Sequence, residues 1–170
     1  GEEALAPATD QTAFAAFLYE ELSFGRHRLQ FGGRVERNAY TVGQRKTSGH
    51  DDHDDHDDDD SSVHLTAPVV RNRNFMGASA SVGVRTELGT GSAFITNLTR
   101  SVRAPALEEL YNFGPHVGNQ AFEVGNPDLH TETTLGLDLS LRHQSARLRG
   151  NLNLYAYDID NFVYASTTTQ

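Results

Sequence analysis

The chain has 170 residues, contains no cysteine and carries a formal net charge of -9 at pH 7. Without cysteine it can form neither a disulfide framework nor a thiolate metal site. Eight of the 23 acidic residues are aspartates between positions 51 and 60, and the other 15 nearly balance the 14 basic residues. This acidic chain has no broad basic patch, so nucleic acid is not an expected partner.

Six segments alternate apolar and polar residues with period two, which predicts β-strands because successive strand side chains point to opposite faces. In chain order they span residues 12–22, 28–36, 76–85, 92–102, 135–142 and 148–157. The clearest is 135–142, where four leucines alternate with Gly136, Asp138, Ser140 and Arg142. The segment 12–22 is apolar on both faces and 92–102 is mixed, so these two have the least defined registers.

The connections between these strands alternate in length. Short links fall near 23–27, 89–91 and 144–147, and long ones span about 38–74 and 104–131, with another beginning after Asp160. This alternation predicts an antiparallel transmembrane β-barrel with short periplasmic turns and long extracellular loops. Six aromatic residues near the long loops are expected to form an interfacial girdle: Tyr40, Phe75, Tyr155, Tyr157, Phe162 and Tyr164.

A soluble β-sandwich would also alternate in this way, but its strands are usually only about 5–6 residues long. The sequence has no run of 18 apolar residues, so no membrane-spanning helix is expected. Six strands are too few to close a membrane barrel, which needs at least about eight. The start at Gly1 without a signal peptide, and the end inside a loop, further suggest an internal stretch of a larger barrel.

The strongest chemical feature is a run of three histidines and eight aspartates between positions 50 and 60, followed by His64. Neutral imidazole and carboxylate groups are ligands for divalent metals, and protons compete for the imidazole. The candidate metal ligands in this run are His50, Asp51, Asp52, His53, Asp54, Asp55, His56, Asp57, Asp58 and His64. The alternative is a solvated acidic loop. The preference for zinc over copper or nickel is weak, since intrinsic affinity favours copper.

A second feature is an ordered set of motifs. Arg103-Ala104-Pro105 is followed by Glu109-Leu110-Tyr111, then by Gly125-Asn126-Pro127-Asp128-Leu129 and Glu132. In order and spacing these resemble the TonB-dependent outer-membrane receptors, and the segment Leu29–Arg34 is similar to that family as well. Thr131 departs from the pattern, in which a proline is common before the glutamate. Pro105 and Asn126-Pro127-Asp128 are expected to shape the chain rather than to contact ligand.

The resemblance implies a barrel of about 22 strands in the outer membrane of a Gram-negative bacterium, closed by a plug domain. It implies energy coupling to the TonB complex through that plug, and contact with outer-membrane lipid. Residues 1–170 would then be part of the barrel domain, without the plug domain. Within them, residues 41–74 would form a His/Asp-rich extracellular loop. Similar loops in zinc-uptake receptors suggest that His50, His53 and His56 capture metal at the surface, with His116 as a candidate ligand for its onward transfer.

Three other functions remain open. A haem receptor could use His116 as an axial ligand, although Val102 stands where haem receptors often have phenylalanine. A ferric-siderophore receptor has no direct support from the loops, and a structural or adhesive barrel would treat the acidic run as a solvated loop. No catalytic motif is present, so we expect no enzyme and no prosthetic group, only a transported ligand: zinc, another divalent metal, or haem.

Overall fold

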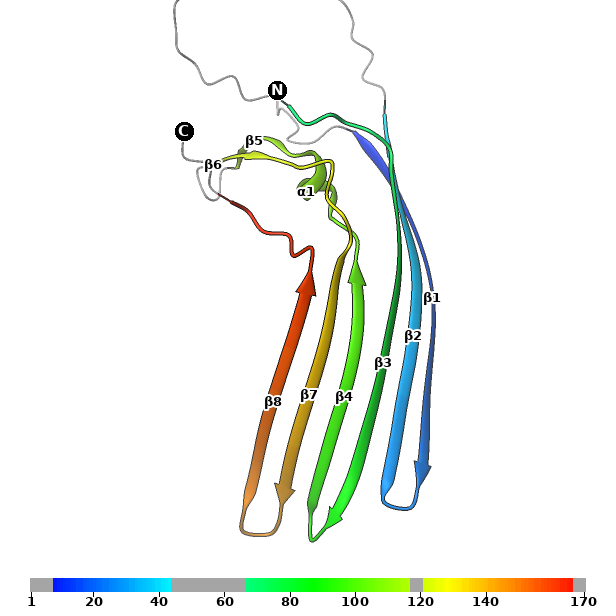
Figure 1. The fold of residues 1–170 in the computed structure, drawn as a ribbon, viewed down its shortest axis with the longest axis vertical. Coiled ribbons are helices and arrows are strands. Elements are labelled where there is room, and N and C mark those ends of the chain that lie inside the picture. Colours follow the sequence, from blue (N-terminus) through cyan, green and yellow to red (C-terminus); the bar gives the residue numbers. More distant parts are fainter. Residues whose placement is uncertain (1–7, 44–66, 117–120, 167–170) are drawn as a thin grey trace, which may run out of the picture. The chain divides into compact units, whose positions relative to one another are not determined.

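The computed structural model describes residues 8–43, 67–116 and 121–166, and the chain in this part is almost entirely β-strand. Within these residues, eight strands and one short helix follow each other: β1 (Thr9–Phe24), β2 (His27–Val42), β3 (Arg73–Gly89), β4 (Ser92–Arg103), α1 (Leu107–Tyr111), β5 (Phe113–His116), β6 (Ala121–Val124), β7 (Glu132–Gln144) and β8 (Arg149–Asp160). Figure 1 shows the six long strands side by side. The helix in the described residues is not long and apolar enough to cross a membrane.

The six predicted strands are confirmed, and they form one antiparallel sheet in the order β1-β2-β3-β4-β7-β8. Every observed strand continues past the predicted end, and four also begin earlier than predicted; β1, for example, has 16 residues. The three short links are confirmed as turns, and Gly25 and Gly91 adopt positive φ angles of 58° and 77° there. Glycine has no Cβ to obstruct this backbone conformation, which explains its place in these turns.

The register between strands separates an apolar from a polar face. Leu139 lies opposite Thr96 on one side and Leu154 on the other, whereas Asp138 lies opposite Asn97 and Tyr155. Partners that face each other across two strands share a face of the sheet. The apolar face therefore carries Val82, Val84, Phe94, Leu98, Leu135, Leu137, Leu139, Leu141, Leu152 and Leu154. Most of these side chains are exposed, as lipid-facing residues of a barrel would be.

The polar face is linked by hydrogen bonds between side chains. The Tyr157 hydroxyl donates to Asp138 over 2.7 Å, and the Ser140 hydroxyl donates to the side-chain oxygen of Asn153 over 2.7 Å. The Tyr157 ring also covers Gly136, where an added Cβ would lie 2.5 Å from ring carbons. A barrel lumen is the place for such a face, because its polar side chains are out of contact with lipid.

The predicted aromatic girdle is wrong for four of its six residues. Tyr155 and Tyr157 lie on the polar face of β8, since they pair with Asp138 and Gly136. Tyr40 and Phe75 are only 3% and 7% exposed. The prediction used position along the strand and ignored which face each side chain occupies. Two residues beyond β8 remain exposed with stacked rings, Phe162 and Tyr164.

The sheet formed by the described residues is open, with β1 and β8 at its edges. Unpaired strand edges are not tolerated in lipid, because their amide and carbonyl groups have no partner there. This agrees with the prediction of a partial barrel.

By its contacts the chain divides into two compact units. One holds residues 12–39, 74–105 and 129–170, which include most of the six-stranded sheet. The other holds residues 1–11, 40–73 and 106–128, with α1 and the separate β5–β6 hairpin, neither of which the sequence pattern predicted.

Candidate metal-capture segment and its anchoring module

The predicted metal ligands lie almost wholly outside the described residues. This holds for His50, His53, His56 and His64, and for the aspartates among them: Asp51, Asp52, Asp54, Asp55, Asp57 and Asp58. His116 is the last residue of β5, where its backbone pairs with Ala121. Among the described residues, no group of three or more histidine, cysteine or acidic side chains could hold a metal ion. Metal binding by these residues therefore stays a prediction.

The residues that flank the His/Asp-rich run are described, and they are tied to each other and to the N-terminal stretch. The Val42 amide donates to the Asn72 side-chain oxygen over 2.9 Å. The next amide, that of Gly43, donates to the Ala8 carbonyl over 2.9 Å. The chain thus leaves the described part at a hydrogen-bonded residue, Gly43, and on the returning side it is hydrogen-bonded at Asn72.

The returning flank is also bonded to a module that we call the anchoring module, residues 106–116 and 121–128. The Arg71 guanidinium pairs with the Asp128 carboxylate, and the Tyr111 hydroxyl donates to the Arg71 carbonyl. The ion pair is half exposed and contributes about 0–1 kcal/mol at most. Tyr111 is 1% exposed, so its buried hydroxyl bond is the more important of the two contacts.

The helix of the anchoring module begins where Pro105 ends the strand. The Ala106 amide donates to the Glu109 carboxylate over 2.7 Å, which satisfies one of the amides that a helix start leaves open. Leu110 and Tyr111 are then fully buried. Pro105 followed four residues later by Glu109 is the local signal that could have predicted this short helix.

The Gly-Asn-Pro-Asp turn packs directly against the end of α1. The Gly125 amide donates to the Asn112 carbonyl over 2.7 Å, and the Asn126 amide donates to the Glu109 carbonyl over 2.9 Å. A Cβ on Gly125 would lie 2.6 Å from backbone atoms of Leu110 and Tyr111, so this close approach requires glycine. Asn126 also accepts the Asp128 amide over 2.9 Å, which confirms the predicted turn chemistry.

Two more contacts complete the module. The Asn112 side-chain amide donates to Glu123 over 3.0 Å, and the Phe113 and Phe122 rings of the β5–β6 hairpin meet edge to face, 5.0 Å apart.

Burial raises the pKa of the Tyr111 hydroxyl, while Arg73 and Arg71 oppose this shift. Tyr111 therefore remains a neutral donor to the Arg71 carbonyl throughout the physiological range.

The Arg-Ala-Pro motif has a structural role in the sheet. Arg103 lies opposite Glu132, the first residue of β7, with their side chains 3.5 Å apart. Glu132 also accepts the Val163 amide over 3.2 Å. Two motifs that are far apart in the sequence are thus neighbours across β4 and β7.

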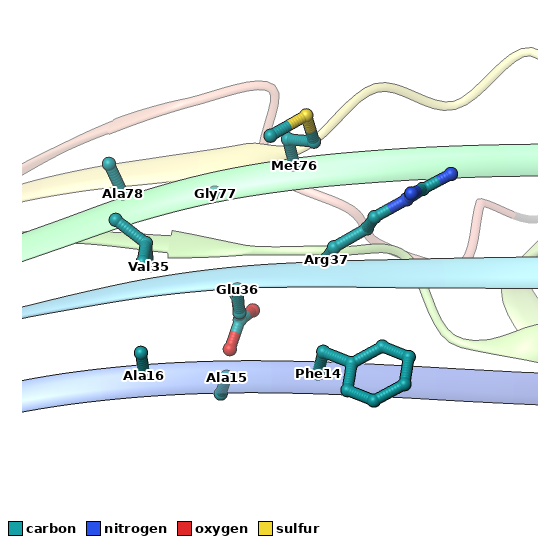
Figure 2. Close-up of a pocket in the computed structure, with 9 residues that line it drawn as sticks. All are labelled: Phe14, Ala15, Ala16, Val35, Glu36, Arg37, Met76, Gly77 and Ala78. Carbon is teal, nitrogen blue, oxygen red and sulfur yellow. The ribbon is translucent and has the colours of Figure 1, made fainter.

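A shallow apolar groove crosses β1, β2 and β3, with its lining drawn in Figure 2. The lining residues are Phe14, Ala15, Ala16, Val35, Glu36, Arg37, Met76, Gly77 and Ala78. Its two charged groups bond elsewhere: Glu36 accepts from Arg34 over 2.9 Å, and Arg37 donates to Asn74 over 3.0 Å. Because no set of free polar groups converges there, the groove is not a candidate metal site.

The comparison with known families decides the class of protein. The family model described as TonB dependent receptor-like, beta-barrel matches residues 3–170. The chain belongs to this family. Its members are transporters rather than enzymes, as the sequence predicted.

A solved structure, the copper transporter OprC, is similar in fold with a TM-score of 0.67 and 20% sequence identity. The match covers 91% of this chain and 23% of that transporter, so this chain spans about a quarter of its length. At this identity the likeness shows the fold. This fold is that of a TonB-dependent receptor barrel, and the six long strands of this chain correspond to one part of it.

Proposed function

We propose that this chain is part of an outer-membrane receptor of a Gram-negative bacterium that imports a divalent transition metal, with zinc as the favoured ion. The His/Asp-rich run captures the ion outside the cell. TonB drives import through a plug domain that occupies the barrel. The observation that carries this proposal is the regular repeat of histidine and paired aspartates between positions 50 and 60.

The chemistry of the run supports capture of a cation. Eight carboxylates concentrate cations near three imidazoles, which supply nitrogen ligands of the kind that zinc, copper and nickel prefer. A purely electrostatic loop would need no histidine. Capture weakens as pH falls, because protons compete with the metal for the imidazole.

The hydrogen bonds of the flanking residues support a proposal that this run works together with the anchoring module. The residues that flank it bond to one another through Val42 and Asn72, and to the module through Arg71. His116 belongs to the same module by its position in β5. A captured ion would then be released close to a second histidine, which is the role that we assign to His116.

Copper is the second candidate ion. It binds nitrogen and oxygen ligands more tightly than zinc does, and a receptor of similar fold is a copper transporter. Haem is a third candidate, which would use His116 as an axial ligand and leave the aspartates without a function.

Metal-limited growth of cells that carry the intact receptor tests the proposal. Replacing His50, His53 and His56 together with alanine should raise the zinc concentration that is needed for growth, while the amount of receptor in the membrane stays the same. The matched control is His130→Ala, which removes an exposed histidine outside the run. Growth that responds equally to both variants, or to neither, would refute the capture role.

Two further measurements separate the candidate ions. Calorimetric titration of a peptide covering residues 49–64 with zinc, copper, nickel and calcium ranks the metals directly. A haem absorbance titration of the intact receptor and of its His116→Ala variant tests the haem alternative. A haem spectral shift that needs His116, together with a peptide that binds no transition metal, would replace the metal proposal with haem import.

A further inference from the structure

One arginine of β4 lies on the apolar face of the sheet. The register places Arg100 opposite Ala80 of β3 and opposite Leu135 of β7. Residues that pair across strands share a face, and Leu135 belongs to the apolar face described above. The Arg100 side chain is exposed, and its Nη1 group donates to the Ala78 carbonyl over 2.5 Å. A guanidinium is thus presented on the side of the sheet that otherwise carries aliphatic side chains.

A second arginine lies on this face two strands away, on β2. Ala78 is two residues from Ala80 on β3, so the two alanines share a face. Figure 2 shows Ala78 and Arg37 on the same side of the groove, whereas Glu36 points to the other side. Arg37 Nε donates to the Asn74 side-chain oxygen over 3.0 Å. Both arginines therefore bond to β3, the strand between them.

Each of these two guanidinium groups keeps most of its hydrogen-bond donors. An arginine side chain has five N–H donors, and the bonds to β3 use only Nε of Arg37 and Nη1 of Arg100. Among the residues that the structure describes, neither arginine takes part in an ion pair. The two positive charges can therefore pair with an anion from outside the chain, and arginine is well suited to phosphate oxygens.

The position of both arginines along their strands matches the outer boundary of the hydrocarbon. A tilted strand crosses the hydrocarbon in about 9–11 residues. Counted from the end with the short turns, Arg37 is the eleventh residue of β2, and Arg100 is the ninth residue of β4. A lipid-facing arginine is costly at the middle of the bilayer but costs little near its interfaces. These two arginines thus lie at the level of lipid headgroups on the long-loop side.

The groove beside Arg37 offers an apolar surface at the same place. Its lining on this face comes from three strands: Phe14 and Ala16 of β1, Val35 of β2, and Met76 and Ala78 of β3. Phe14, Val35 and Met76 are 72%, 59% and 77% exposed, so the described chain does not cover them. An alkyl chain suits such a groove, because it gains contact with carbon atoms and needs no polar partner.

We propose that the outer end of this face binds a phosphorylated lipid of the outer leaflet. Its phosphate groups pair with the guanidinium groups of Arg37 and Arg100, and one of its acyl chains lies in the groove. The inference rests on the proposed location of the barrel in the outer membrane, with its long loops outside the cell. A second copy of the chain fits less well, because a symmetric contact through this patch would bring the like charges of both copies together.

The test measures lipid retention by the intact receptor. The purified receptor is incubated with diphosphorylated lipid A, or with the same lipid after removal of its phosphates, and is analysed by native mass spectrometry. Each basic residue near an anionic surface strengthens binding by about five-fold, so Arg37→Gln with Arg100→Gln should lower retention of the phosphorylated lipid by about 25-fold. Retention of the dephosphorylated lipid should stay as in the wild type.

Two further variants test the face and the groove. Arg34→Gln with Arg142→Gln removes the same charge from the polar face, since Arg34 pairs with Glu36 and Arg142 lies opposite Asn151. This control should retain the phosphorylated lipid as the wild type does. Ala16→Trp fills the groove and should lower the retention of both lipids.

Four outcomes would overturn the proposal. The first is unchanged retention of the phosphorylated lipid in the Arg37/Arg100 variant. The second is an equal loss in the Arg34/Arg142 control, which would indicate a general effect of charge. The third is equal retention of both lipids by the wild type, which would show that phosphate is not recognised. The fourth is a dimeric receptor without bound lipid, which would assign the groove to a second copy. Lipid retention does not involve metal, so its failure would leave the capture proposal unaffected.

Discussion

Replacing Gly125 with alanine should loosen the anchoring module and leave the barrel strands intact. The added Cβ would lie 2.6 Å from the Leu110 carbonyl carbon and from the Tyr111 nitrogen, and 2.8 Å from the Asn112 nitrogen. All three are backbone atoms, which cannot rotate away as the end of a side chain can. The turn must therefore move off the end of α1.

The cost of this movement follows from the contacts that it strains. Overpacking at a rigid site costs about 1–3 kcal/mol. The two backbone hydrogen bonds that hold the turn, from Gly125 to Asn112 and from Asn126 to Glu109, contribute about 0.5–1.5 kcal/mol each. The module should lose about 2–6 kcal/mol in total, which raises its open population by at least about 30-fold.

Hydrogen exchange on the intact receptor measures this opening. Amides between residues 106 and 128 should exchange at least about 30-fold faster in the variant, because local opening controls their exchange. Amides of the sheet should not change. The control is Gly150→Ala in β8, where an added Cβ meets nothing within 4 Å. Unchanged exchange between 106 and 128, or equal effects of the two variants, would refute the packing that we describe.

Two other substitutions test the faces of the sheet and the contact to the His/Asp-rich flank. Leu139→Arg should make membrane insertion less favourable by about 2–4 kcal/mol, because it places a charge on the apolar face. Its control, Ser140→Arg on the polar face, should insert normally. The reverse result in an insertion assay would mean that the two faces are exchanged. Tyr111→Phe should cost about 0.5–1.5 kcal/mol by removing the bond to Arg71, measured as faster proteolysis of the flank. The raised pKa of Tyr111 means that folding favours the neutral hydroxyl. The stability that this hydroxyl contributes is therefore complete below pH 10.0 and is lost as pH rises through the folded pKa. This pH dependence of stability should be absent from Tyr111→Phe.

The six long strands could be predicted from the sequence because alternation is a local property of the chain. Residues 135–142 already separate leucines from polar residues, and the sheet keeps that separation. The family motifs also predicted the class of barrel correctly. The aromatic girdle failed because distance along a strand does not say which face a side chain occupies, as Tyr155 and Tyr157 demonstrate.

The sequence by itself determined the strand pattern, the alternation of turns and loops, and the His/Asp-rich run, since each depends on neighbouring residues alone. Only the tertiary structure decided how distant residues meet. It joined Arg71 to Asp128 and Tyr111, and it placed Arg103 beside Glu132. Such contacts depend on strand order and register, which are set by hydrogen bonds between segments far apart in the chain.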